Sequence, residues 1–389
     1  MFIYSITPQI ATDIERFEQV AKRFDVMNTL PRTWRGRVRR DLEAESIGAS
    51  VALEGVAVTI DEVRRILAGD EPRNVTDEDI ALVRGYREAM GYVLTRADDP
   101  SFAWTADTIR IIHASVMARS WAQRAGLYRE RQNWLQDSYG EQVYLSPPTE
   151  AVPGLVDELV EWLNDDVQSL PVLVQAALAH VMLAAIHPFQ DGNGRTARIV
   201  ASLTMYRGEH RSPAFTSLEE WWGAHPADYY AAFRCLGTEW DPHADVTPFV
   251  AAHVAAQRTQ ADALSLRHAT ERLLWSALED IVMNELGMDE RAANALWECF
   301  FGRPVTNRYY RGIADVPQVT ASHDLKQLQT SGLIVAVGAG RSRSYTGTLD
   351  LARRVSELFE LDVDVRGSGE LDAEVRGDVT RALAAKAAL

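Results

Sequence analysis

The feature that most constrains this chain is an apolar segment, residues 172–186, that runs into a loop rich in glycine and charge. The segment is apolar nearly all round, which predicts a buried central helix. Pro188 cannot continue a helix, so we expect His187 at the helix end, facing the loop. Gly192-Asn193-Gly194 allows backbone N–H groups to converge, and a second helix is expected to start near Arg195. The chain is therefore predicted to fold around two consecutive helices joined by a polar loop.

This loop also combines groups that handle phosphate. A glycine-rich turn that opens a helix is a ready anion site, because free amides and the positive end of the helix dipole both favour phosphate. Arg195 and Arg198 lie three residues apart and share a helix face at that end. His187 adds a base and Asp191 an acid. The alternative is a glycine-rich turn with a solvated basic face. It is the weaker explanation, because these residue types would then occur together at these positions only by chance.

The segment from His187 to Arg198 resembles the signature of the Fic family, His-x-Phe-x-(Asp/Glu)-Gly-Asn-Gly-Arg-x-x-Arg, and every fixed position is present. The resemblance extends to residues 125–129 and 144–148, which are similar to the family segments on either side of a β-hairpin flap. It covers roughly residues 30–260. It implies a mainly all-α fold, namely a Fic helical core with a β-hairpin flap at residues 130–146.

What the resemblance implies is a protein adenylyltransferase, which transfers AMP from ATP to a Tyr, Ser or Thr hydroxyl of a target protein or of itself. His187 would be the catalytic base, Asp191 the Mg²⁺ ligand and the flap the docking site for the target. A reference pKa near 6.5 suits a histidine base at neutral pH. The other implied contacts are all to the nucleotide: Gly192, Asn193 and Gly194 with the α- and β-phosphates, Arg195 with the β-phosphate, Arg198 with the γ-phosphate, and Tyr229 or Tyr230 with the base.

Residues 50–55, Ser-Val-Ala-Leu-Glu-Gly, form a pattern that is weak when taken alone, since a helix that ends at a glycine C-cap explains it equally well. Upstream of a Fic signature it is similar to the family's inhibitory motif, (Ser/Thr)-x-x-x-Glu-(Gly/Asn), with Ser50, Glu54 and Gly55 at the fixed positions. The resemblance implies that Glu54 pairs with Arg198. A carboxylate and a guanidinium form a bidentate bond in a partly dry site, and Arg198 so occupied cannot hold a γ-phosphate.

The overall composition restricts the class of protein. The formal net charge of −15 argues against a dedicated nucleic-acid coat protein, although it leaves room for a local basic module. Cys235 and Cys299 are too few for a disulfide framework. The N-terminus lacks the basic and long apolar regions of a signal peptide, and no apolar run approaches the length of a membrane span. We therefore predict a cytoplasmic protein without membrane association.

After about residue 290 the sequence predicts a winged helix: a helix over residues 305–316, a second capped by Thr320, and a β-hairpin over residues 333–346. Between Arg303 and Tyr345 there are six Lys/Arg against two Asp, a local net charge of +4. Two interpretations stay open. The module binds DNA phosphates through helix and wing, or it is a protein-docking or homodimer module.

We therefore expect four regions: an N-terminal helical region with the inhibitory motif (1–100), the Fic core (101–260), a connecting helix with the winged helix (261–360), and a tail (361–389). Three hypotheses for the function remain. The first is an adenylyltransferase autoinhibited by Glu54. The second is another phosphodiester chemistry at the same site: a different nucleotide, phosphocholine transfer, or removal of AMP. The third is a transcription regulator in which the Fic core is a sensor. The intact arginine pair favours a triphosphate donor.

Overall fold

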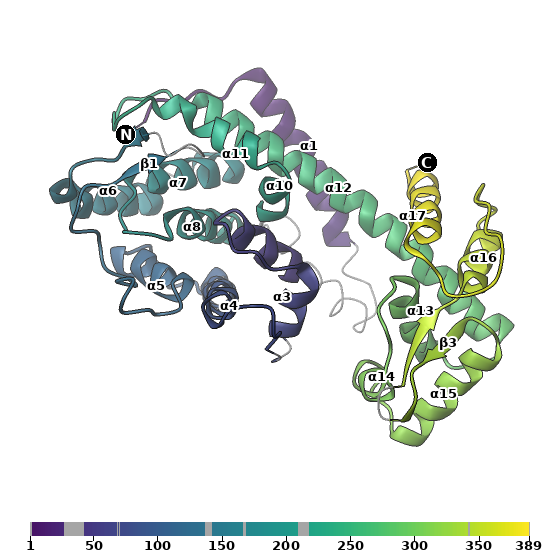
Figure 1. Cartoon of the computed structure of the whole chain (residues 1–389). Coiled ribbons are helices and arrows are strands. Elements are labelled where there is room, and N and C mark those ends of the chain that lie inside the picture. Colours follow the sequence, from purple (N-terminus) through teal and green to yellow (C-terminus); the bar gives the residue numbers. More distant parts are fainter. Residues whose placement is uncertain are drawn as a thin grey trace. The chain divides into compact units, whose positions relative to one another are not determined.

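The chain folds mainly into α-helices, as predicted (Figure 1). By its internal contacts it divides into two compact units, residues 1–262 and 263–389. The finer division expected from the sequence, with boundaries near residues 100, 260 and 360, stays a prediction. The residues that the computed structural model describes are 2–26, 43–67, 69, 71–136, 142–165, 169–208, 218–340 and 343–388.

Two consecutive helices, α7 (Val172–Ile186) and α8 (Asn193–Arg207), form the centre of the first unit. In α7 only Val172 and Gln175 are not buried, which explains why its sequence is apolar nearly all round. The helix has 15 residues, and no helix among the described ranges is long and apolar enough to cross a membrane. Helix α8 begins two residues earlier than predicted, because Gly192, with φ at 73°, already provides its N-cap position.

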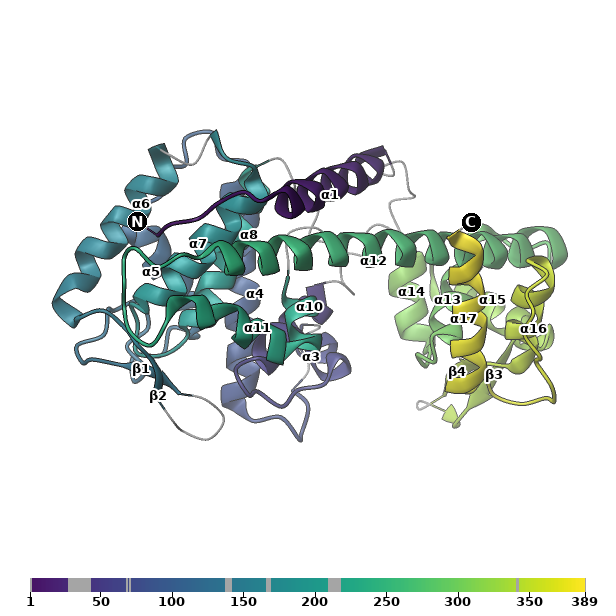
Figure 2. The ribbon, with the colours of Figure 1, turned by 90° about the horizontal axis from the view of Figure 1, so that it is seen from above.

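Further helices surround this central pair. Helices α4 (Asp77–Ala97) and α5 (Ala106–Val116) pack against α8, and α6 (Val152–Asp165) packs against α7. Helix α3 (Ile60–Leu67) starts with a capping box, because the Thr59 N–H donates to Glu62 Oε2 at 2.8 Å and the Glu62 N–H donates to Thr59 Oγ1 at 3.3 Å. Helix α1 (Pro8–Val26) lies along the first part of α12 (Thr247–Asp280), as Figure 2 shows.

The predicted flap is a short antiparallel hairpin of β1 (Trp134–Gln136) and β2 (Gln142–Leu145). Asp137-Ser138-Tyr139-Gly140, a turn signal by residue type, lies outside the described residues. On its other side, β2 pairs with an extended segment: the Leu145 N–H donates to Thr238 O at 2.8 Å, and the Trp240 N–H donates to Leu145 O at 2.9 Å. Strand β2 therefore has a neighbour on each side, and β1 is an edge strand.

The second unit has its own helical core and one hairpin. It begins with the end of α12 and the short turns η5 (Ile281–Glu285) and η6 (Glu290–Ala292). It continues with α13 (Ala293–Phe300), α14 (Asn307–Ala314), α15 (Gln318–Thr330), β3 (Ile334–Val337), β4 (Ser344–Gly347), α16 (Leu349–Leu358) and α17 (Ala373–Ala387). In α15, Leu325 and Leu328 are buried, and Tyr310 of α14 is fully enclosed.

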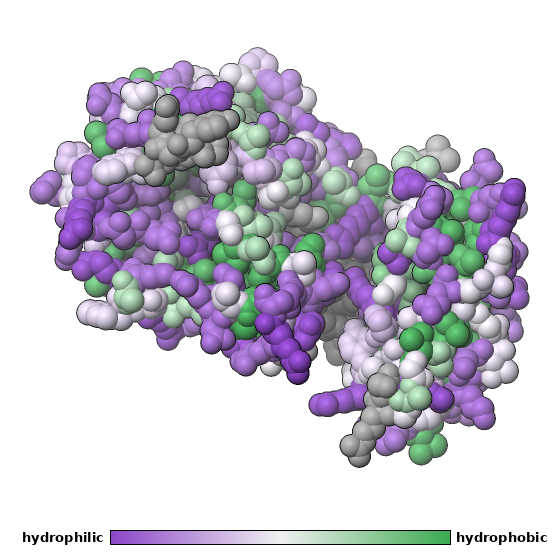
Figure 3. Space-filling model, viewed as in Figure 1, coloured by the Kyte–Doolittle hydropathy of each residue, from purple (hydrophilic) through white to green (hydrophobic). Residues whose placement is uncertain are grey.

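The order of α14, α15 and the hairpin agrees with the predicted elements, while the winged-helix assignment itself stays a prediction. The predicted cap at Thr320 is wrong, because α15 already begins after Pro317 and Thr320 lies inside its first turn. The expected tail contributes to the core of this unit, since α17 packs against α16 and buries Val379 and Leu383 completely. On the face shown in Figure 3, hydrophilic residues cover most of the surface of both units.

Candidate functional site

His187 ends α7 in the left-handed conformation, with φ at 51°. Its Nδ1 lies 3.2 Å from the carbonyl oxygen of Ala184. Because a carbonyl oxygen only accepts, this hydrogen bond places the ring proton on Nδ1 and leaves the lone pair of Nε2 available. Burial lowers the pKa of His187 to about 4, against the opposing effect of the Ala184 hydrogen bond. At neutral pH the imidazole is therefore an uncharged base.

Arg129 connects the His187 loop to the base of the flap. Its Nε donates to His187 O at 2.9 Å, its Nη2 to Pro147 O at 2.5 Å, and its Nη1 to Thr149 Oγ1 at 3.0 Å. The residue is 2% exposed, and burial lowers its pKa. The sequence indicated this segment only through its resemblance to the family and gave Arg129 no role. In the structure, Arg129 fixes the position of the predicted base relative to the flap.

The side chain of Asn193 holds the loop from inside. Its Oδ1 accepts the Phe189 N–H at 2.9 Å, and its Nδ2 donates to Phe189 O at 2.9 Å. Both ends of the amide are thus used within the loop, and the residue is 2% exposed. Asn193 was expected to contact phosphate through this side chain. The side chain therefore shapes the loop, while the backbone N–H of Asn193 lies in the first turn of α8, and a contact of this residue with phosphate stays a prediction.

His113 is a packed structural histidine. Its ring stacks on Phe189 with centroids 3.7 Å apart and an interplanar angle of 2°. Its Nδ1 accepts the Gly126 N–H at 2.8 Å, and its Nε2 lies 2.9 Å from Asp191 O. Burial lowers the pKa of His113 to about 4. These contacts attach the loop to α5 without placing His113 at the loop's open side.

Asp191 is the exposed acid of the loop, with 61% of its side chain accessible. Its Oδ1 accepts the Gly192 N–H at 2.6 Å. No group of three or more His, Cys, Asp or Glu side chains that could hold a metal occurs within the described ranges. Mg²⁺ commonly takes one or two carboxylates and completes its shell with water and phosphate oxygens. A single exposed carboxylate beside the start of α8 is the kind of ligand that Mg²⁺ takes.

Arg195 is enclosed, with 4% of its side chain exposed, yet its donors are poorly used. Its Nε and Nη1 have no hydrogen-bond partner within the described part of the chain. The nearest carboxylate oxygens, of Glu54 and Asp191, lie 3.9 and 3.8 Å from its nitrogens. Buried donors are rarely left unpaired, and the first N–H groups of α8 also lack acceptors within their helix. The two features together indicate an anion site.

Arg198 makes the predicted pair with Glu54. Its Nη2 donates to Glu54 Oε1 at 2.9 Å and to Ser50 O at 3.1 Å, and its Nε donates to Ser50 Oγ at 3.1 Å. The expected bidentate bond is wrong: Arg198 contacts one carboxylate oxygen, and the other lies 3.9 Å from Arg195. Glu54 therefore bridges the two arginines. We call the contacts of Arg198 with Ser50 and Glu54 the latch.

Local backbone geometry explains why the latch residues lie where they do. Residues 43–52 are helical, and the turn that follows the helix ends at Gly55, whose φ of 84° favours glycine. A Cβ at Gly194 would lie 2.7 Å from Glu54 Oε1, so a side chain there would displace the end of Glu54. Burial alone would lower the pKa of Arg198, but the neighbouring Tyr229 hydroxyl and the Glu54 carboxylate raise it above its usual value. Arg198 is therefore a permanent cation in the site.

The two candidate base-pocket tyrosines differ in burial. Tyr229 is 3% exposed, and its hydroxyl accepts from Arg198 Nη1 at 3.2 Å and lies 3.3 Å from His180 Nε2. Burial raises the pKa of Tyr229 to about 12. Tyr230 is 58% exposed, and its hydroxyl donates to Leu53 O at 2.9 Å. Of the two, Tyr230 is the one that can reach a ligand, and at present it contacts the inhibitory segment.

Two buried polar residues near the latch were missed by the sequence analysis. Tyr86 of α4 is fully enclosed, and its hydroxyl donates to Glu219 Oε1 at the start of α10 (Glu219–Ala224). Glu219 is 1% exposed. A glutamate at a helix start is usually solvated, and these two residues lie 133 positions apart. No local pattern in the sequence could therefore have indicated this contact.

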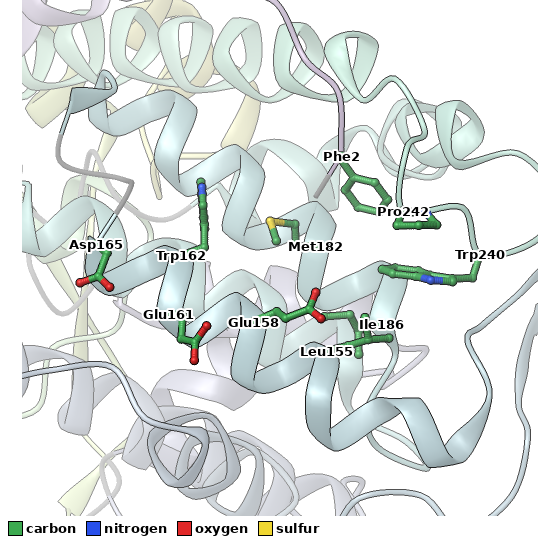
Figure 4. Close-up of a pocket in the computed structure, with 10 residues that line it drawn as sticks. All are labelled: Phe2, Leu155, Glu158, Glu161, Trp162, Asp165, Met182, Ile186, Trp240 and Pro242. Carbon is green, nitrogen blue, oxygen red and sulfur yellow. The ribbon is translucent and has the colours of Figure 1, made fainter.

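A separate cavity of about 320 Å³ lies beside α6 and α7 (Figure 4). Its walls combine aromatic rings, among them Phe2, Trp162 and Trp240, with acidic side chains of α6 such as Glu158. Ile186, the last residue of α7, is the wall residue closest in sequence to the signature loop. None of residues 187–198 lines this cavity, so it is distinct from the anion site.

Residues 103–205 match the model of the Fic/DOC family. Protein adenylyltransferase Fic of Nematostella vectensis is 28% identical over 244 residues, which are 61% of this chain and 53% of that protein. Protein adenylyltransferase fic-1 of Caenorhabditis elegans is 29% identical over 211 residues, 52% of this chain and 37% of that protein. The chain thus spans about half, or less, of the length of these relatives.

Solved structures show the same fold. A Fic family protein from Desulfovibrio desulfuricans G20 superposes with a TM-score of 0.58 at 22% identity, over 88% of this chain and 97% of that one. A fragment of Fic-1 from Caenorhabditis elegans superposes with a TM-score of 0.55 at 24% identity, over 67% of this chain and 74% of that one. At these identities the likeness establishes the helical architecture.

Proposed function

We propose, from the premise that this chain contains a domain of the Fic/DOC family, that it is a protein adenylyltransferase held inactive by Glu54. It transfers AMP from ATP to a hydroxyl side chain of a target protein or of itself. The names of its relatives support this reaction class. The observation that carries the proposal is the buried Arg195, which has two donors without a hydrogen bond beside the start of α8, where a phosphate can bind them.

In this proposal the nucleotide phosphates lie over the start of α8. The N–H groups of Asn193 and Gly194 and the free donors of Arg195 bind the α- and β-phosphates, joined by the Gly192 N–H once Asp191, which accepts it here, turns to the metal ion, and Arg198 binds the γ-phosphate. Asp191 would hold Mg²⁺, which when bound supplies positive charge for the diphosphate. Tyr230, released from Leu53, would contact the base. The backbone N–H groups at the start of α8 are fixed by the helix before the nucleotide arrives, which is the arrangement that stabilises developing charge most effectively.

The chemical step needs one proton acceptor. The target hydroxyl oxygen attacks the α-phosphorus, a P–O bond to that oxygen forms, and the bond to the leaving pyrophosphate breaks. His187 Nε2 accepts the hydroxyl proton, since its Nδ1 is occupied with Ala184 O. The edge strand β1 can take a segment of the target as an additional strand, which would fix the hydroxyl near His187.

Inhibition by Glu54 follows from two contacts. While its carboxylate occupies Arg198, the γ-phosphate has no guanidinium to bind. The same carboxylate adds negative charge between the two arginines, where the triphosphate must enter. The glutamate therefore excludes ATP from its productive position without blocking His187.

The test is labelling of the purified chain with radioactive ATP in the presence of Mg²⁺, with intact mass spectrometry to identify an AMP adduct. We expect little adduct on the wild type, strong labelling of Glu54→Gly, and none on Glu54→Gly with His187→Ala. The last variant should still bind ATP, because the base acts on the hydroxyl and not on the nucleotide. Labelling of the His187→Ala double variant at the rate of Glu54→Gly would refute the proposed mechanism.

A further inference from the structure

The cavity beside α6 and α7 has a wall that the proposed function does not use. Its volume of about 320 Å³ is within the range of small-molecule sites. The wall combines three aromatic rings with three carboxylates, and none of its described residues is basic. These six residues are Phe2, Trp162, Trp240, Glu158, Glu161 and Asp165. The size and the wall of the cavity are therefore those of a binding site for a small ligand.

Backbone contacts between distant segments hold the aromatic part of the wall. The Ile3 N–H donates to Ala244 O at 3.0 Å, which places the N-terminal segment beside residues 240–244. The rings of Phe2 and Trp240 have their centroids 5.5 Å apart and their planes tilted by 54°. The Trp240 N–H in turn donates to Leu145 O of the flap strand β2 at 2.9 Å. The aromatic wall is therefore formed before a ligand enters, which lowers the cost of binding.

The acidic part of the wall comes from one face of α6. Glu158, Glu161 and Asp165 are three and four residues apart, so they follow one another along the helix. All three are exposed, and no other described residue forms an ion pair with them. In the view of Figure 4, the Glu158 carboxylate lies between the rings of Trp162 and Trp240. The cavity thus joins aromatic surface to negative charge that no described wall residue balances.

This combination restricts the chemistry of the ligand. An anion would be repelled by the carboxylates, and an uncharged apolar ligand would gain nothing from them. A metal ion does not fit, because no group of three His, Cys, Asp or Glu within the described ranges could hold one. An alkylammonium group satisfies both parts of the wall, since aromatic faces attract a cation and its alkyl groups pack against the rings.

We propose that this cavity is a binding site for a small organic cation whose charge is an alkylammonium group. Such a ligand would contact Ile186, the last residue of α7 before His187, and the ring of Trp240, whose backbone holds β2. ATP would not compete for the cavity, because its anionic phosphates are suited to the guanidiniums at the start of α8. The inference does not depend on the proposed adenylylation, since none of residues 187–198 lines the cavity.

The test is calorimetric titration of the full chain with tetramethylammonium chloride. The matched ligand is tert-butanol, which is similar in size and shape but uncharged, and all titrations are done at constant ionic strength. We expect saturable binding of tetramethylammonium that is at least about tenfold tighter than that of tert-butanol. Equal affinity for the two ligands would show a cavity without preference for cations and would overturn the proposal. Absence of saturable tetramethylammonium binding would overturn it as well.

Two variants locate the binding. Glu158→Gln keeps the shape of an exposed side chain and removes its charge, so tetramethylammonium should bind about two- to tenfold more weakly, with no change for tert-butanol. The matched control is Asp157→Asn, since Asp157 is an exposed acid on the same helix that does not line the cavity. It should leave the affinity unchanged. Equal weakening by the two variants would mean general attraction to an acidic protein, which refutes the site.

Trp240→Leu removes an aromatic ring and leaves the backbone N–H that binds Leu145. It should weaken tetramethylammonium binding by about two- to tenfold. If this variant fails to fold, Glu158→Gln still decides, because it changes an exposed helix position. Binding that persists at full strength in Glu158→Gln lies elsewhere on the protein, and the inference is then wrong.

Discussion

Arg198 in the first unit and Arg291 in the second each pair with a carboxylate beside a buried tyrosine. The two pairs differ in which partner is buried: the arginine in the first pair, and the carboxylate in the second. Arg291 binds Asp324 through two nitrogens, at 2.9 and 3.2 Å, with 29% of the arginine side chain and 5% of the aspartate side chain exposed. Arg198 binds Glu54 through one nitrogen, with 2% of the arginine and 22% of the glutamate exposed.

This difference indicates which pair can open. In the second unit the carboxylate is interior, and Tyr310 binds it as well, so separation would leave a buried anion without its cation. In the first unit the interior partner is the guanidinium, which keeps Ser50 and Tyr229 as partners, and the anion that replaces Glu54 can be a phosphate. We therefore interpret Arg291–Asp324 as part of the scaffold and Arg198–Glu54 as exchangeable.

The strongest test of this contrast is Glu54→Gly. A charge-assisted pair contributes on the order of 1.5–3 kcal/mol, so we expect adenylylation to rise by about ten- to a hundredfold, with little change in thermal stability. Radioactive labelling measures the gain. The gain should vanish when Arg198→Ala is added, because it depends on the freed guanidinium. A folded Glu54→Gly protein with unchanged or lower labelling would place Arg198–Glu54 in the same class as Arg291–Asp324.

The converse variant is Asp324→Asn. It removes the charge that Arg291 and Tyr310 bind, and we expect it to lower the free energy of unfolding by about 1.5–3 kcal/mol. Denaturant unfolding of the full chain, followed at the transition of the second unit, measures this loss. Labelling per folded molecule should stay at the wild-type level. A gain of activity in Asp324→Asn would mean that the second pair also acts as a switch.

A smaller effect should appear in the titration of His187. Its pKa of about 4 lies below the usual value mainly because of burial, while the charge of Glu54 raises it. The neutral ring is the active form, so activity should persist at pH 6 and disappear as the pH falls through the folded pKa. Glu54→Gly should move that pKa further down, and Asp324→Asn should not move it. NMR titration of the His187 ring, with His187→Ala for assignment, measures both shifts, and an equal shift in the two variants would contradict the contrast.

The smallest expected effect concerns the basic segment of the second unit. If its local charge of +4 serves DNA phosphates, the full chain should bind a DNA duplex weakly at low salt and lose binding steeply as salt rises. Arg308 and Arg311 are exposed on α14, and Arg308→Gln with Arg311→Gln should flatten the salt dependence. A gel shift at low salt is sufficient. Absence of any shift would favour the protein-docking interpretation.

The sequence predicted the site where its chemistry lies in consecutive residues. His187, Asp191 and the two arginines fall within 12 positions, so backbone geometry alone brings them together once the apolar helix ends. The contact of Glu54 with Arg198 followed from the family resemblance. The resemblance did not predict that Arg198 would bind only one oxygen of Glu54. That geometry depends on how residues 43–55 pack against α10, a segment far away in the sequence.

Two further differences have local physical causes. Thr320 is a good N-cap by type, but Pro317 has already set the dihedral angles that start α15, so the threonine falls inside the helix. Asn193 was expected to reach phosphate, but its amide fits both backbone groups of Phe189. An amide side chain next to unsatisfied backbone groups can serve either purpose, and residue type alone cannot distinguish them.

The left-handed backbone at His187, with φ at 51°, has a consequence for laboratory evolution of this protein. A non-glycine residue in that region costs on the order of 1 kcal/mol, whereas glycine adopts it freely and asparagine tolerates it well. A library selected only for heat resistance should therefore enrich glycine or asparagine at position 187. The proteins that survive such a selection would be more robust and would have lost the base, so thermostabilisation of this enzyme has to be screened together with activity.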